Sequence, residues 1–251
     1  SKMITACQES GGLVHGAIAW MGGYPVSAGD GGVGLQYSLK IGDEWKGTWA
    51  PYVVVPDKWF YIIAQGHCSV MVSRKQFMEF GGYGGLVGER IEHKHRSYGG
   101  TELQLDLKWW MFGSTVVVHP QAIGYHLKSY RGYSWNHDDY IHNIFNCMYS
   151  LGLDDWLERT YIHYAIRGSQ EVLDRMMEEA KREMKDIREF IEQKRVKTYN
   201  EVLVEKPWDV LNMKRHGIKN THMLVYHYSW LEMLQKAPER VKEMYRKSDK
   251  M

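Results

Sequence analysis

A helix bounded by glycines, with a carboxylate in its first turn, constrains the fold of this chain most strongly. The pattern begins at Gly99 and Gly100, which permit positive φ angles or a close approach of the backbone. Thr101 can cap the helix, and leucine and tryptophan side chains give it apolar surface before Gly113 ends it. Glu102 then lies in the first turn, where the helix dipole favours a charged carboxylate.

Two neighbouring patterns frame this helix. Upstream, residues 66–83 contain an apolar run, a short helix capped by Ser73 and a Gly-Gly-Tyr turn. Downstream, residues 115–119 predict a strand, and His126 follows just past a strand end. The chain therefore alternates strands and helices around the acidic helix.

These patterns keep a fixed order. Arg74, Phe77 and the turn at residues 81–83 form a first motif. A second motif consists of Gly99, Gly100, Glu102, Leu105 and Lys108. Over roughly residues 12 to 150 the order resembles the second half of GT-A glycosyltransferases, especially glycosyltransferase family two and the polypeptide N-acetylgalactosaminyltransferases. The resemblance implies an α/β fold with a partial GT-A-type mixed sheet and flanking helices.

Two features depart from the family pattern. Thr101 stands where the family usually has its first acidic residue, so one carboxylate remains at the helix start. An Asp-x-Asp motif should precede this region, but the Asp pairs at residues 138–139 and 154–155 come after it. We consider three explanations: a fragment or separately encoded half, a numbering that begins inside a longer protein, or a lost donor site.

Composition sets broader limits. Hydrophobic residues make up 44% of the 251 residues and aromatic residues 13%, which excludes a disordered chain. A net charge of +2 gives no overall basic field. The three cysteines are widely spaced, which favours a reducing compartment over a disulfide framework or a zinc site. With no apolar run of about 18 residues, we expect no membrane span and a cytoplasmic location, in the host if the protein is viral.

The sequence changes from strand-like and helical patterns to mainly helical patterns near residue 151. We predict an α/β acceptor and metal half over residues 1–150, with strands at 13–20 and 61–64 as well, and a mainly α-helical C-terminal domain over residues 151–251. Helical patterns in the second part cover three segments, residues 171–197, 221–235 and 239–246.

Sugar transfer from a nucleotide donor needs a divalent ion to neutralise the diphosphate and a group that orients or deprotonates the acceptor hydroxyl. Mn²⁺ and Mg²⁺ prefer oxygen ligands, and Mn²⁺ also accepts imidazole. The resemblance implies that His126 binds this metal. His119 is a second candidate ligand, and the alternative for His126 is a structural role in which it packs against tyrosines. It implies that Glu102 is the catalytic base, while the alternative is a carboxylate that satisfies free N–H groups of its helix.

Further residues are candidates for donor or acceptor binding. Arg131 and Trp135 lie in a polar-aromatic loop that could close over the donor or simply pack as a connection. Trp45 and Trp49 could stack on a sugar or base, or belong to the core. The complete set predicted to bind donor or acceptor is Gly99, Gly100, Thr101, Arg131, Trp135, Trp45, Trp49 and His67.

Basic residues are concentrated in two segments that could bind a nucleic acid. Lys94 and Arg96 precede the second glycine pair, and Lys181, Arg182 and Lys185 lie on a predicted helix. The more usual explanation for the helix is a solvated face with charge pairs three or four residues apart.

Three functional hypotheses follow. The first is a metal-dependent transferase, or its acceptor-side half, that moves a sugar to a hydroxyl of a protein, a glycan or a modified base of phage-type DNA. A separate chain could then supply the N-terminal nucleotide-binding half. The second is a non-catalytic binding or assembly module derived from such an enzyme. The third is a nucleic-acid-binding protein without chemistry.

Overall fold

The structure is a computed structural model of the whole chain. It describes residues 2–21, 32–38, 46–51, 58–62, 64, 69–84, 101–127, 137–165, 168–199 and 201–202. Within these ranges, only the backbone is described for residues 17–21, 32–38, 46–51, 101–103, 120 and 123–127.

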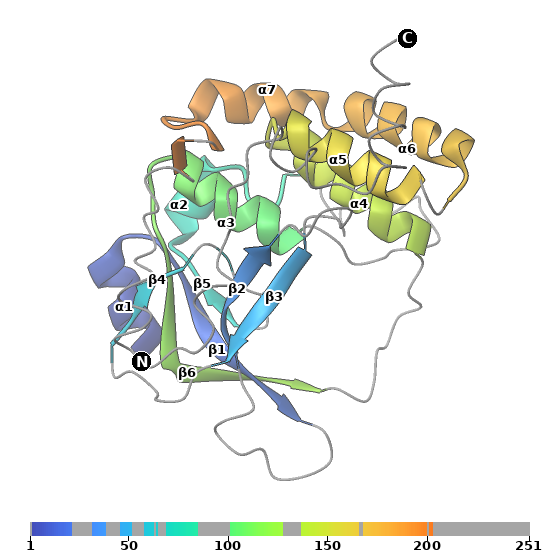
Figure 1. Cartoon of the computed structure of the whole chain (residues 1–251). Helices are drawn as coiled ribbons and strands as arrows, with labels where there is room; N and C mark the ends of the chain where they lie inside the picture. Colours follow the sequence, from blue (N-terminus) through green and yellow to red (C-terminus); the bar gives the residue numbers. More distant parts are fainter. Residues whose placement is uncertain are drawn as a thin grey trace.

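A mixed β-sheet forms the N-terminal part of the described chain (Figure 1). Its strands are β1 (Leu13–Met21), β2 (Gly32–Ser38), β3 (Lys46–Pro51), β4 (Phe60–Tyr61), β5 (Val70–Met71) and β6 (Val116–Leu127). The strand order is β3-β2-β1-β6-β4, and β5 pairs with β1. The central strands β1 and β6 are parallel, while β2, β4 and β5 add antiparallel pairings around them.

The β1–β6 pairing is interrupted by a bulge. His15 lies beside Val118, but the register shifts after Gly16, so that Ala17 lies beside Ile123. A β-carbon at Gly16 would come within 2.3 Å of the Ala122 carbonyl oxygen, so only glycine fits against the bulged strand. Beyond this point both strands continue in parallel to Met21 and Leu127.

Helices cover both faces of the sheet. Alternate residues of a strand point to opposite faces. Val14 and Val117 accordingly pack with Ala6 of α1 (Lys2–Ser10), whereas Leu13 and Val116 join the larger core. That core contains buried side chains of α3 (Thr101–Met111), α4 (His137–Ser150) and α5 (Asp154–Ala165). Figure 1 shows α4 and the later helices gathered beyond α3, away from α1.

The α/β class, the mixed sheet with flanking helices and the helical remainder are confirmed. One apolar core joins both parts, since it contains Trp109 and Phe145 as well as Trp156, Leu173 and Ile191. This core crosses residue 151, and the division into two domains stays a prediction. Within the described part of the chain, no helix has the length and apolar character needed to cross a membrane.

Two element boundaries differ from those expected. The helical pattern over residues 171–197 forms two helices, α6 (Gln170–Glu183) and α7 (Lys185–Lys194), with Met184 between them at φ −101° and ψ 6°. The predicted strand at 115–119 extends to Leu127, so His126 lies within β6 instead of just past a strand. The segments 221–235 and 239–246 lie outside the described residues.

Candidate functional site

The end of α3 fixes its direction relative to β6. Gly113 adopts φ 75°, its amide donates to the Trp110 carbonyl at 3.1 Å, and the Ser114 amide donates to the Trp109 carbonyl at 3.0 Å. This pair of hydrogen bonds satisfies carbonyls at the helix end and reverses the chain. β6 begins at Val116, five residues after the end of α3 at Met111. The predicted helix end at Gly113 is confirmed.

A buried polar pair anchors α3 to the central strand. The Nε2 atom of His15, on β1, lies 3.0 Å from Oδ1 of Asp106, and both side chains are fully buried. Directional contacts inside an apolar core restrict how a helix can rotate or slide. Because position 102 precedes Asp106 by four residues, both positions lie on the same side of α3. The pair therefore sets where the Glu102 backbone lies against the sheet.

Glu102 and His126 lie on two elements that are consecutive among those the structure describes. Thr101 and Glu102 are the first residues of α3, and His126 is the second-last residue of β6, in register with Trp20 of β1. The predicted first-turn position of Glu102 is therefore confirmed. The side chains of Thr101, Glu102 and His126 lie outside the described atoms, so their catalytic, binding and metal roles stay predictions.

His119, the second candidate metal ligand, contacts the backbone of its own strand. His119 is 6% exposed, and its Nδ1 accepts a hydrogen bond from the Gln121 amide at 3.3 Å. This contact lies where β6 bulges away from its pairing with β1. Across the described residues, no group of three or more His, Cys, Asp or Glu side chains could hold a metal ion.

The two motifs of the sequence contact one another. Ser73 caps α2 (Arg74–Glu79), as predicted, by accepting the Gln76 amide at 3.1 Å. After α2, a glycine turn at residues 81–84 contains three positive φ angles. Lys108, from α3, donates from its ammonium to the carbonyl of Gly82 in this turn. Burial lowers the pKa of Lys108 to about 7.

Sequence reasoning did not find several polar residues around α3. Gln76 accepts from Trp109 Nε1 at 3.2 Å and donates to Ser114 Oγ at 2.8 Å, so it joins α2 to both ends of the turn after α3. His15 and Asp106 were also missed, because 91 residues separate them. Local sequence patterns do not predict contacts between residues so far apart. A histidine inside an apolar strand is only a weak indication of a buried polar contact.

The basic residues on the C-terminal helices lie beside acidic ones. Lys181 lies 2.8 Å from Glu178, Lys185 lies 3.9 Å from Glu189, and Arg182 lies 3.8 Å from Glu183. The pairs of Lys181 and Lys185 are exposed and fit the solvated helix face described above, whereas the Glu183 side chain is mostly buried. Binding of a nucleic acid by Lys181, Arg182 and Lys185 stays a prediction.

The other predicted binding positions are described in part or not at all. The backbone of Trp49 belongs to β3 and lies beside Leu35 of β2. The remaining residues lie outside the described part of the chain: Gly99, Gly100, Arg131, Trp135, Trp45, His67, Lys94 and Arg96.

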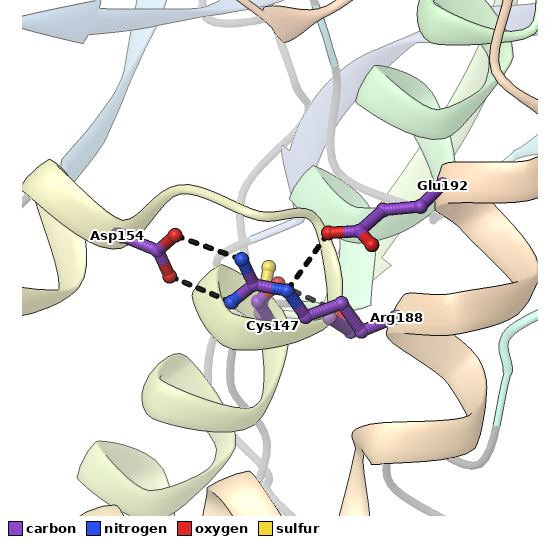
Figure 2. A network of polar contacts seen from close by, with 5 residues as sticks. Cys147, Asp154, Arg188 and Glu192 are labelled. Atoms are coloured by element: carbon purple, nitrogen blue, oxygen red, sulfur yellow. Dashed lines mark hydrogen bonds and ion pairs between the residues drawn. The ribbon is translucent and has the colours of Figure 1, made fainter.

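A polar network lies among the C-terminal helices (Figure 2). Arg188 of α7 donates two hydrogen bonds to the Asp154 carboxylate, at 2.7 and 2.8 Å, and a third to Glu192 at 3.0 Å. Its guanidinium also lies 4.8 Å from the centroid of the Tyr149 ring. Arg188 lowers the pKa of Asp154 by hydrogen bonding and by its charge. The network ties the start of α5 to α7.

In comparisons with known proteins, the chain matches solved structures only. No family model matches the sequence, and no curated protein matches it. Among solved structures, the chain is similar to a crystal structure of GalNAc-T7 with UDP, GalNAc and Mn²⁺, at 14% sequence identity and a TM-score of 0.49. The match covers 84% of this chain and spans 37% of the length of that chain.

Proposed function

We propose that the chain is a metal-dependent glycosyltransferase, or its acceptor-side half, that moves a sugar from a nucleotide-sugar donor to a hydroxyl acceptor. One observation carries the proposal: α3 is anchored to β1 by the buried Asp106–His15 pair, with Glu102 one turn earlier. β6 carries His126, which is in register with Trp20 near the carboxyl ends of two parallel strands. Ligands of open α/β sheets bind beyond such strand ends.

Glu102 acts as the base in this proposal. Its carboxylate takes the proton of the acceptor hydroxyl as the hydroxyl oxygen bonds to the anomeric carbon of the sugar. The bond between that carbon and the donor phosphate breaks, and its electron pair leaves with the nucleoside diphosphate. A first-turn helix position suits a carboxylate that must stay charged until it receives the proton.

His126 is the residue of this chain that we assign to Mn²⁺ or Mg²⁺. Such an ion would supply positive charge to the diphosphate leaving group. The described residues contain no three-ligand cluster, so we assign no other ligand and no metal geometry. Imidazole is an acceptable ligand for Mn²⁺ beside oxygen ligands, which makes Mn²⁺ the better fit for this position.

Donor and acceptor binding complete the proposal. We assign them to Gly99, Gly100, Thr101, Arg131, Trp135, Trp45, Trp49 and His67 on the sequence patterns given above. The acceptor class is a hydroxyl on a DNA base, a protein or a glycan, and a second chain could contribute the nucleotide-binding half.

A non-catalytic binding or assembly module is the second candidate. Two observations favour it: the sequence contains no Asp-x-Asp motif, and the described residues hold no cluster of metal ligands. Such a module would keep the fold and its contacts without binding a nucleotide sugar.

Replacement of Glu102 by Gln tests the proposed chemistry. With Mn²⁺ and a panel of nucleotide sugars that includes UDP-GalNAc, we expect the unchanged chain to release nucleotide. Glu102→Gln should lower the rate at least about 100-fold, because the amide cannot accept the proton. The melting temperature should fall only slightly, because the neutral amide loses the interaction of a carboxylate with the helix dipole but keeps the shape of the side chain. Coupled detection of released nucleoside diphosphate measures the rate.

Glu189→Gln is the matched control, because the Glu189 side chain is exposed on α7 and lies 3.9 Å from Lys185. It should keep full activity. An unchanged rate in Glu102→Gln would refute the role of Glu102. If the unchanged chain neither turns over any donor nor gains thermal stability with Mn²⁺ and donor, the non-catalytic module is the better description.

A further inference from the structure

Lys108 is a buried lysine that has no partner of opposite charge among the described residues. Its side chain is 1% exposed, and its ammonium donates to the carbonyl of Gly82. The Trp109 ring centroid lies 5.9 Å from the ammonium nitrogen. A carbonyl and an aromatic ring replace only part of the water that an ammonium loses on burial. In the described structure, Lys108 forms no ion pair with any carboxylate.

Gln104 offers a second acceptor one turn away on the same side of α3. Ser150 donates its hydroxyl proton to the Cys147 carbonyl at 2.9 Å, so toward Gln104 it can only accept. Gln104 must therefore present its NH₂ group to Ser150, at 3.4 Å, which orients the side-chain amide. The other amide atom, Oε1, is buried and has no hydrogen-bond partner within the part of the chain that the structure describes. Residues four apart on a helix are neighbours, so Gln104 and Lys108 lie on the same side of α3.

The glycines of the turn that Lys108 contacts have little room for a side chain. Gly82 and Gly84 have φ angles of 50° and 57°. A β-carbon at Gly82 would lie 2.9 Å from the Phe77 ring, and one at Gly84 would lie 3.1 Å from Gln104 Nε2 and 3.2 Å from Ile187. The glycine turn is thus enclosed by α2, α3 and α7, and the same two polar side chains of α3 line one side of it.

Several charged groups on the surrounding elements form contacts of their own. On α3, Asp106 contacts His15 of β1. On α7, Arg188 is bound to Asp154 and Glu192. On α2, the charged pair is exposed, and α4 contributes the uncharged groups of Ser150 and Cys147. The titratable groups in this region are Asp106, Tyr83, Cys147, Lys75, Glu79, Asp186 and Arg188.

We propose that Lys108 and Gln104 form a proton-controlled latch that holds the glycine turn at residues 81–84 against α3. The closed turn keeps water from the amine, which suits the neutral form. Opening of the turn lets water solvate the ammonium, so a bound proton favours the open state. This inference does not depend on the proposed sugar transfer.

The sign of the pH effect follows from proton linkage. Burial lowers the pKa of Lys108 from 10.5 to about 7 in the closed state. Between these two values the open state binds more protons than the closed state, so opening becomes rarer as pH rises. Below about pH 7 both states are protonated, and the opening equilibrium no longer changes with pH.

Amide hydrogen exchange in the full chain tests the latch. The Gly82 amide donates to the Phe77 carbonyl at 2.9 Å, and the Gly84 amide donates to the Gly81 carbonyl at 3.0 Å, so both report opening of the turn. After correction for intrinsic exchange, their protection should rise about tenfold between about pH 7 and pH 8.5. In Lys108→Met the protection should not change over this range. Lys75→Met, which alters an exposed lysine of α2, should behave like the unchanged chain.

A second variant covers the case in which Lys108→Met does not fold. Gln104→Glu places a carboxylate beside the ammonium, so the pH at which protection rises should move upward and the turn should be better protected at about pH 7. Titration of the Lys108 side chain in the unchanged chain, followed by NMR of its Cε, should give a midpoint near the lowered value. A midpoint near the ordinary lysine value, or equal pH profiles for the unchanged chain and Lys108→Met, would overturn the latch.

Discussion

At the scale of single residues, the His15–Asp106 pair shows what sequence patterns cannot reveal. The two side chains are 91 residues apart and meet only because β1 and α3 pack together. The burial of Lys108 was also hidden, because lysine is almost always exposed. By contrast, the Ser73 cap and the end of α3 at Gly113 were predictable, since each depends on residues within a few positions.

The buried pair yields a prediction at this scale. Asp106→Ala should lower the free energy of unfolding by roughly 3 to 5 kcal/mol, because it removes one partner of a fully buried polar contact. Urea denaturation followed by circular dichroism measures the change. Asp186→Ala, at the exposed start of α7, should cost far less. Equal losses in the two variants would mean that the pair does not anchor α3.

At the scale of elements, β1, α2, α3 and β6 were predictable, but α1 and α4 were not singled out and the interruptions were not foreseen. A single helical pattern over residues 171–197 divides at Met184, whose side chain is 1% exposed in the common core. Apolar residues continue on both sides of the break, so periodicity alone indicates one helix. Strands β2 and β3 were not singled out either, because antiparallel pairing between them depends on partners along the sheet.

The arginine network makes α5 and α7 a test of element packing. Arg188→Leu should lower the free energy of unfolding by about 1 kcal/mol at neutral pH, since Asp154 is largely exposed and solvent screens the pair. Asp154 has a pKa below its ordinary 3.8, so this stabilisation is present above about pH 4 and is lost as pH falls further. Urea denaturation at neutral pH and at about pH 3 should show the difference shrinking.

Arg182→Leu provides the control for this prediction. Arg182 is exposed on α6 and lies 3.8 Å from Glu183, without a bidentate contact. Its replacement should leave stability nearly unchanged at both pH values. A loss in Arg188→Leu that stays the same in acid would show that packing on the Tyr149 ring, and not the Asp154 contact, dominates.

At the scale of the whole molecule, the sequence predicted an α/β part followed by helices, and the structure has both. Glycine-rich apolar runs followed by charge-rich helical patterns make this division visible in the sequence. The common core that joins the two parts was not predictable, because its members lie between residues 13 and 202 and approach only in the folded chain. The relation of the candidate site to this framework depends on the parallel register of β1 and β6.

Paramagnetic broadening by Mn²⁺ tests the central claim most directly, that Glu102 and His126 serve one metal-dependent site. In NMR spectra of the full chain with a nucleotide sugar, added Mn²⁺ should broaden the amide signals of Trp20, His126 and Glu102 while those of α7 stay sharp. His126→Ala should abolish this selective broadening. Broadening that favours α7, or that is the same with and without His126, would contradict the proposed site.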